Sequence, residues 1–169
     1  VLVGHSYGGA VITQAATDRD DIAHLLYVAA FALDDGESVL GCLGAMERHD
    51  VELASAMVPT PDGTATTLVP AAAVPALYGN CPDQAIAAAL PRLGPQSMAS
   101  MTEEVVGDPR ASIPATYVVC SQDRAVHPAH QQVMAERCTT VHVLDTDHSP
   151  FLSSVAATAD IIEQIASAS

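Results

Sequence analysis

Residues 1–9 read Val1-Leu2-Val3-Gly4-His5-Ser6-Tyr7-Gly8-Gly9, and the organisation of the whole chain can be worked out from this stretch. It contains the pattern Gly-x-Ser-x-Gly, which is typical of a sharp turn between a strand and a helix that exposes a serine hydroxyl at the top of a parallel sheet. The apolar run before the pattern suits a buried strand, and residues 10–16 suit a buried helix. We therefore expect Ser6 to be a nucleophile in a strained turn.

Three further strand-like runs, at residues 24–29, 116–120 and 141–144, alternate with helical or mixed sequence. This alternation predicts an α/β fold with a parallel sheet of about four strands. The first strand has the apolar character of a central, buried strand. We therefore expect the sequence to start partway through a domain.

The stretch between the second and third strands is too long for a simple crossover. It holds most of the proline and glycine, and we interpret residues 34–114 as an inserted, mainly helical lid. Residues 1–33 and 115–169 would then form the sheet domain. Within the lid we expect a turn at residues 60–64 and helices at residues 38–46, 82–90 and 95–105.

A final helix is predicted after the fourth strand. Ser149 is a suitable N-cap residue and Pro150 a suitable first helical residue. One apolar face is predicted from residues at helical spacing, namely Leu152, Val155, Ala159, Ile162 and Ile165.

The composition excludes several classes of function. The chain has 20 acidic and 6 basic residues, a net charge of −14, and all six basic residues are arginine. Such a surface repels phosphate backbones and anionic lipids, which argues against nucleic-acid and membrane partners. The absence of lysine removes Schiff-base chemistry. No apolar run approaches the length of a membrane span.

The four cysteines contain no C-x-x-C pair, so we expect neither a zinc site nor a disulfide framework. A bridge between Cys42 and Cys81 stays open as an alternative. We expect a reduced, cytoplasmic protein with no metal and no cofactor.

A serine hydroxyl needs a base, usually a histidine that a carboxylate orients. In parallel sheets such groups follow the carboxyl ends of strands. His148 follows the fourth strand and Asp123 the third, so we expect Ser6, Asp123 and His148 to form a catalytic triad. The alternatives for the acid are Asp145 and Asp147 beside His148, and Asp34 and Asp35 after the second strand. The backbone N–H of Tyr7 is the expected oxyanion donor.

Three segments of the chain together resemble the α/β-hydrolase superfamily. They are the Gly-x-Ser-x-Gly turn at residues 4–8, Ser121-Gln122-Asp123-Arg124-Ala125 and Asp147-His148-Ser149-Pro150-Phe151. Within it, the chain is similar to the small esterases grouped with plant methylesterases and hydroxynitrile lyases. The resemblance implies the same triad. It also implies that only the C-terminal part of the family's domain is present, from the fifth strand to the eighth, and that the second oxyanion donor lies outside this sequence.

The lid is expected to shape a substrate pocket, although core packing is the alternative for each candidate. The candidates are Leu77, Tyr78, Met98 and Met101, with Phe31 and Phe151 at the floor.

Together these features predict a serine hydrolase that cleaves a small carboxylic ester through an acyl-enzyme. A hydroxynitrile lyase is the first alternative, but the resemblance implies a lysine next to the catalytic histidine, where this chain has Ser149. A small-molecule receptor of the same fold that keeps its triad is the second alternative. Turnover of substrate separates the receptor from the enzyme.

Overall fold

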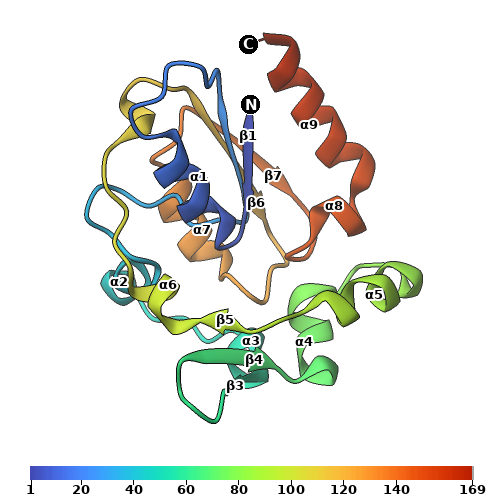
Figure 1. Cartoon of the computed structure of the whole chain (residues 1–169). Coiled ribbons are helices and arrows are strands. Elements are labelled where there is room, and N and C mark those ends of the chain that lie inside the picture. Colours follow the sequence, from blue (N-terminus) through green and yellow to red (C-terminus); the bar gives the residue numbers. More distant parts are fainter. Residues whose placement is uncertain (169) are drawn as a thin grey trace.

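The computed structural model describes residues 1–168 of the chain. Its centre is a four-stranded sheet in the order β1-β2-β6-β7, and every neighbouring pair is parallel (Figure 1). The strands are β1 (Leu2–His5), β2 (Leu25–Val28), β6 (Ala115–Cys120) and β7 (Thr140–Leu144). All four correspond to predicted runs, so the predicted α/β fold class is confirmed.

Helices cover both faces of the sheet. α1 (Gly8–Ala16) and α7 (Pro128–Ala135) pack on one face, in a core that includes Tyr27 and Tyr117. α9 (Val155–Ala168) packs on the other face, against Leu26 and Val118. Neighbouring residues of a strand point to opposite faces, so each central strand contributes to both cores. β2 and β6 are buried along their whole length, whereas β1 and β7 are the edges of the described sheet.

Residues 34–114, which we call the inserted segment, lie mostly at the carboxyl ends of the strands (Figure 1). The segment contains a three-stranded antiparallel sheet, β3-β4-β5, which the sequence did not predict. Its elements are α2 (Val39–Ala45), α3 (Glu52–Ala56), β3 (Met57–Pro59), β4 (Ala65–Leu68), α4 (Pro70–Leu77), α5 (Asp83–Ala89), η1 (Leu90–Arg92), β5 (Gln96–Ser97), α6 (Met98–Thr102) and η2 (Pro109–Ala111).

The predicted helix at residues 95–105 is too long. Residues 96–97 pair with β4, and only Met98–Thr102 are helical. The predicted turn at residues 60–64 is confirmed, since it joins β3 to β4. There the carboxylate of Asp62 accepts hydrogen bonds from the hydroxyl of Thr60 and the amide of Thr64.

Hydrogen bonds of Arg110 and an ion pair of Arg137 fasten the inserted segment to the sheet domain. The guanidinium of Arg110 is almost fully buried and bonds the carboxylate of Asp34, the carbonyl of Leu33 and the hydroxyl of Tyr27. Arg137, just after α7, pairs with Glu37. A buried arginine needs several such partners to offset the loss of its hydration.

The predicted single C-terminal helix is two helices. α8 (Pro150–Ser153) ends at Ser154, and α9 starts at the next residue. The break changes the rotation of the helix, so α9 buries Thr158, Ile161 and Ile165, whereas Val155 is 60% exposed. The predicted apolar face is therefore right for Ile162 and Ile165, which pack in the core with Leu26 and Val118, and wrong for Val155 and Ala159, which are exposed.

All four cysteines of the described chain are free thiols, so Cys42 and Cys81 form no bridge. Residues 1–168 contain no helix with both the length and the apolar character that a bilayer crossing requires.

Candidate active site

Ser6 occupies a strained turn at the end of β1. Its φ is 53°, in the left-handed region that residues other than glycine rarely adopt. Its carbonyl oxygen accepts hydrogen bonds from the amides of Gly9, at 3.0 Å, and Phe31, at 3.1 Å. Its own amide donates to the carbonyl of Val28, at 3.2 Å. The turn is therefore held by α1, by β2 and by the loop after β2, which is how the surrounding structure maintains the strain.

Two glycines make this turn sterically possible. A Cβ on Gly4 would lie 2.6 Å from the carbonyl oxygen of Gly8, and a Cβ on Gly9 would lie 2.6 Å from the carbonyl oxygen of Phe31. A Cβ on Gly8 would have no neighbour within 4 Å. The close approach therefore requires Gly4 and Gly9, although the sequence pattern points to Gly4 and Gly8.

His148 and Asp123 form a buried pair. Nδ1 of His148 lies 2.7 Å from Oδ2 of Asp123, and both side chains are almost fully buried. The other oxygen, Oδ1, accepts from the amides of Ala125 and Val126, and the amide side chain of Gln131 donates to Oδ2. These bonds fix the carboxylate against the imidazole.

Among the described carboxylates, Asp123 is the one that bonds the His148 ring. Asp145 instead accepts from the side chains of Ser121 and Gln122. Asp34 pairs with Arg110 and Asp35 accepts from the amide of Gly107, both away from His148.

Asp147 holds the loop that carries His148. Its carboxylate accepts from the amides of Asn80 and Ser149 and from the hydroxyl of Ser153. The thiol of Cys81 also donates to it, at 3.3 Å. Burial alone would raise the pKa of Asp147, but these hydrogen bonds outweigh it and hold that pKa below its usual value.

His5 packs against the ring of His148, a role that the sequence did not suggest. The two ring centroids are 4.4 Å apart, and Nε2 of His5 donates to the backbone carbonyl of His148, at 2.7 Å. Phe151 also packs edge-on against His5, with the ring centroids 4.9 Å apart. Burial, reinforced by His148, lowers the pKa of His5 to about 3. His5 is therefore a neutral, fixed support for His148.

This support should make folding stability depend on pH. The pKa of His5 falls from 6.5 to about 3 on folding. Below about pH 6.5 the unfolded chain therefore binds a proton that the folded chain does not, and stability falls as the pH is lowered. We expect His5→Gln to remove this contribution, so that the variant loses about 2 kcal/mol less stability between pH 7 and pH 5 than the unsubstituted protein.

Urea unfolding at both pH values measures the difference. His142→Gln, which changes a partly exposed histidine on β7, is the matched control and should lose as much stability as the unsubstituted protein. Equal losses in the two variants would contradict the role given to His5.

Tyr7 is the N-cap residue of α1, directly after Ser6. Its backbone N–H therefore has no carbonyl partner within the helix. This is the position in which the sequence placed the oxyanion donor.

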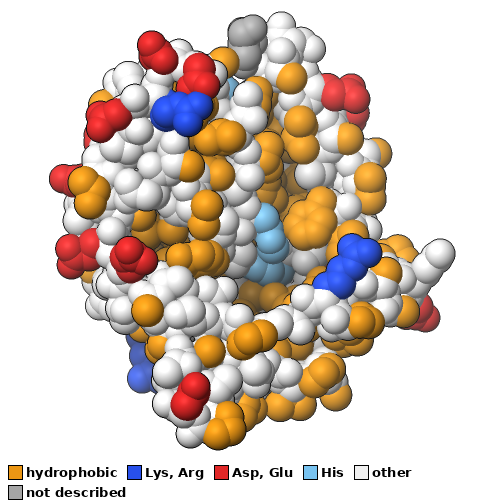
Figure 2. Space-filling view, viewed as in Figure 1, with side chains coloured by type: hydrophobic (Ala, Val, Ile, Leu, Met, Phe, Trp, Pro, Cys, Tyr) orange, Lys and Arg blue, Asp and Glu red, His pale blue; other side chains and the backbone are white. Residues whose placement is uncertain are grey.

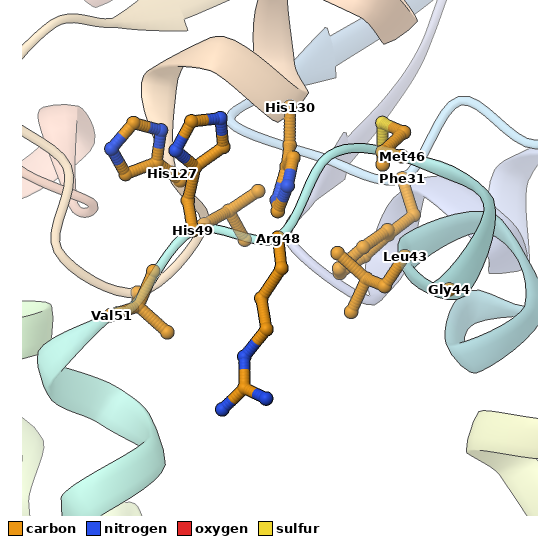
Figure 3. A pocket seen from close by; sticks show the side chains of 11 residues that line it. Phe31, Leu43, Gly44, Met46, Arg48, His49, Val51, His127 and His130 are labelled. Carbon is orange, nitrogen blue, oxygen red and sulfur yellow. The ribbon is translucent and has the colours of Figure 1, made fainter.

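A pocket of about 410 Å³ adjoins the residues that hold the triad candidates. Its wall includes Phe31, whose amide bonds the Ser6 carbonyl, and Ala125 and Val126, whose amides bond Asp123. The remaining wall comes from residues 43–51 of the inserted segment and from residues 127–130 (Figure 3).

Of the predicted pocket residues, Phe31 lines this pocket and the other five lie elsewhere. Leu77 and Tyr78 belong to a core that joins α3 and α4 to Ala125. Met101 packs against the main core, and Met98 is half-buried in α6. Phe151 is 42% exposed beside His5. Figure 2 shows a hollow in this face of the molecule, with histidine side chains in it and hydrophobic side chains on its walls.

The described residues contain no group of three or more histidine, cysteine or acidic side chains that is arranged to hold a metal ion. A strained serine, a buried histidine–carboxylate pair and a pocket thus lie together at one edge of a parallel sheet. This combination is typical of hydrolases with a serine nucleophile.

Residues 1–161 match the Alpha/beta hydrolase family, and the chain belongs to that family. A curated relative, the α/β hydrolase nvfD of Aspergillus novofumigatus, is 31% identical over 146 residues. That match covers 81% of this chain and 56% of the relative, so the chain spans little more than half of the relative's length.

The fold also matches solved structures. A pyrethroid hydrolase from Sphingobium faniae superposes with a TM-score of 0.80 at 20% identity, over 99% of this chain and 70% of that one. The methylesterase MES16 from Arabidopsis superposes with a TM-score of 0.74 at 23% identity, over 98% of this chain and 68% of that one. The predicted family, including its likeness to plant methylesterases, is thus confirmed.

Proposed function

We propose that this protein is a serine hydrolase that cleaves small carboxylic esters. The observation that carries the proposal is the buried contact of 2.7 Å between Nδ1 of His148 and Oδ2 of Asp123, at the same sheet edge as the strained Ser6 turn. In this proposal Ser6 is the nucleophile, His148 the base and Asp123 the group that orients the base.

The hydrogen bond to Asp123 places the proton of a neutral His148 on Nδ1 and leaves Nε2 free to accept. Nε2 takes the proton of the Ser6 hydroxyl as Oγ attacks the ester carbonyl. The amide of Tyr7 stabilises the negative oxygen of the tetrahedral intermediate. His148 then returns the proton to the leaving alcohol, and water releases the acid from the acyl-enzyme by the same steps.

The comparisons support an ester as substrate. Proteins of the same fold are described as a methylesterase and a polyneuridine aldehyde esterase, and others as pyrethroid hydrolases. The alternative of a hydroxynitrile lyase is not favoured, since Ser149 stands next to His148 and the chain has no lysine. A receptor of the same fold would bind esters without turning them over.

We expect a fluorophosphonate to modify the intact protein at Ser6, because an activated serine next to a base attacks phosphorus as it attacks a carbonyl. Peptide mapping by mass spectrometry locates the adduct. Ser6→Ala should abolish labelling, whereas Ser121→Ala, at an exposed serine near Asp123, should leave it intact. An adduct on any other residue would overturn the assignment.

A further inference from the structure

The pocket described above has an unusual lining for this chain. Its apolar side chains include Phe31, Leu43 and Val51, and its polar side chains are those of Arg48, His49, His127 and His130. Within residues 1–168, no aspartate or glutamate lines it. In a protein with a net charge of −14, four basic side chains without an acidic one in a single pocket need an explanation.

The three histidines form one cluster. The rings of His49 and His127 stack with their centroids 4.1 Å apart, and the ring of His130 lies 5.3 Å from that of His49. Figure 3 shows His49 and His127 side by side on one side of the pocket and Phe31, Leu43 and Met46 on the other. His130 and Arg48 lie between these two groups.

The hydrogen bonds of this cluster leave donors available. Nδ1 of His127 accepts from the amide of Ala129, so in the neutral ring the proton is on Nε2. Nε2 of His130 donates to the carbonyl of Glu47, which holds that ring in place. His127 lines the pocket, and no hydrogen bond from its Nε2 to an acceptor occurs within residues 1–168.

Arg48 is only weakly neutralised. Its guanidinium is 3.8 Å from the carboxylate of Asp50, and both side chains are more than nine-tenths exposed. Such a pair contributes little, because water screens it. Arg124 pairs with Glu52, and Asp123 bonds His148. The negative charge of Asp123 also acts on His127, but it does not outweigh the effects that lower the pKa of that ring.

Neighbouring imidazoles also oppose each other's protonation. Burial, together with His49 and His130, lowers the pKa of His127. An anion among the rings would offset this repulsion and would accept the free N–H bonds. A neutral ligand can accept such a hydrogen bond, but it does not offset the repulsion between protonated rings.

We propose that this pocket binds the carboxylate of a small acid with an apolar body, whose apolar part packs on Phe31 and Leu43 and whose charge faces Arg48 and the histidine cluster. The proposal rests on the proposed function, because ester hydrolysis releases such an acid. The volume of the pocket, about 410 Å³, is within the range of small-molecule sites. The bound acid is either the product of the reaction or the free carboxyl group of a half-ester substrate.

Binding is tested in intact Ser6→Ala protein, so that the result does not depend on hydrolysis. Isothermal titration calorimetry at pH 7 compares 4-phenylbutyrate with 4-phenylbutyramide, which has the same shape without the charge. We expect the acid to bind about tenfold more tightly than the amide. Arg48→Gln should weaken binding of the acid about three- to tenfold and leave that of the amide nearly unchanged.

Two further variants complete the design. His49→Phe keeps an aromatic ring against His127 but removes the ring nitrogens. It should also weaken binding of the acid and leave binding of the amide nearly unchanged. Arg92→Gln, at an exposed arginine in η1, is the matched control and should change neither affinity. Equal affinity for acid and amide, or equal effects of Arg48→Gln and Arg92→Gln, would overturn the proposal while leaving fluorophosphonate labelling of Ser6 unaffected.

Steady-state kinetics of the unsubstituted protein distinguish a bound product acid from the free carboxyl group of a half-ester substrate. A half-ester substrate predicts a lower KM for monomethyl adipate than for dimethyl adipate. Product binding predicts equal KM values together with competitive inhibition by the released acid. Either result supports the pocket assignment. If the protein shows no preference for the half-ester and the released acid does not inhibit it, the assignment is contradicted.

Discussion

Replacing Ser6 or His148 with alanine in the intact protein is expected to lower kcat for a small ester about 10⁴- to 10⁶-fold. The double variant should lose little more, since the nucleophile and its base act as one unit. Steady-state turnover of p-nitrophenyl acetate measures both effects. Additive losses in the double variant would show that the two residues act separately.

The same assay separates the two buried carboxylates. Asp123→Asn should lower kcat about 10⁴-fold, because an amide no longer holds His148 in the required tautomer. Asp147→Asn should be far milder, because Asp147 bonds the backbone around His148 and not its ring. If Asp147→Asn were the more severe change, the acid would have been assigned to the wrong residue.

The second large effect concerns folding. Gly9→Ala is expected to destabilise the protein by more than about 3 kcal/mol, because the new methyl group would meet the backbone of Phe31 at 2.6 Å and only a backbone shift could relieve the clash. Such a shift would also break the hydrogen bond from Phe31 to the Ser6 carbonyl.

Gly8→Ala is the matched control. It adds the same methyl group in the adjacent position, into open space at the start of α1, and should be neutral or stabilising by up to about 1 kcal/mol. Urea unfolding of the two variants measures the contrast. Similar stabilities would contradict the steric account of the turn.

The sheet and the candidate site were predictable because they depend on local signals. Each strand is a short apolar run, and functional groups in parallel sheets follow strand ends. Asp123 and His148 are positioned in this way, and the structure places their side chains 2.7 Å apart.

The inserted segment was less predictable, because its structure depends on contacts between residues far apart in sequence. β4 and β5 are short and rich in polar residues, and Gln96 becomes a strand residue by pairing with Thr66. A periodic pattern favours a helix there, and the pairing overrides it. The break at Ser154 likewise carries no proline or glycine that would signal the end of α8.

His5 and the pocket lining other than Phe31 were missed for a related reason. His5 is the variable residue of a turn pattern, and its contact with His148 spans 143 positions of the chain. His49 and His127 are also far apart in sequence and meet only because residues 46–51 fold over α7. The sequence alone contains no signal for contacts between residues so far apart in the chain.

The hydrogen bonds of Asp147 have a mechanical consequence. One carboxylate joins the amide of Asn80, in the inserted segment, to the loop that positions His148. Any outward displacement of the turn at Asn80 therefore pulls on the backbone beside His148 or breaks a buried bond. The position of the Asn80 turn and the alignment of the His148 ring are in this way mechanically coupled through one carboxylate.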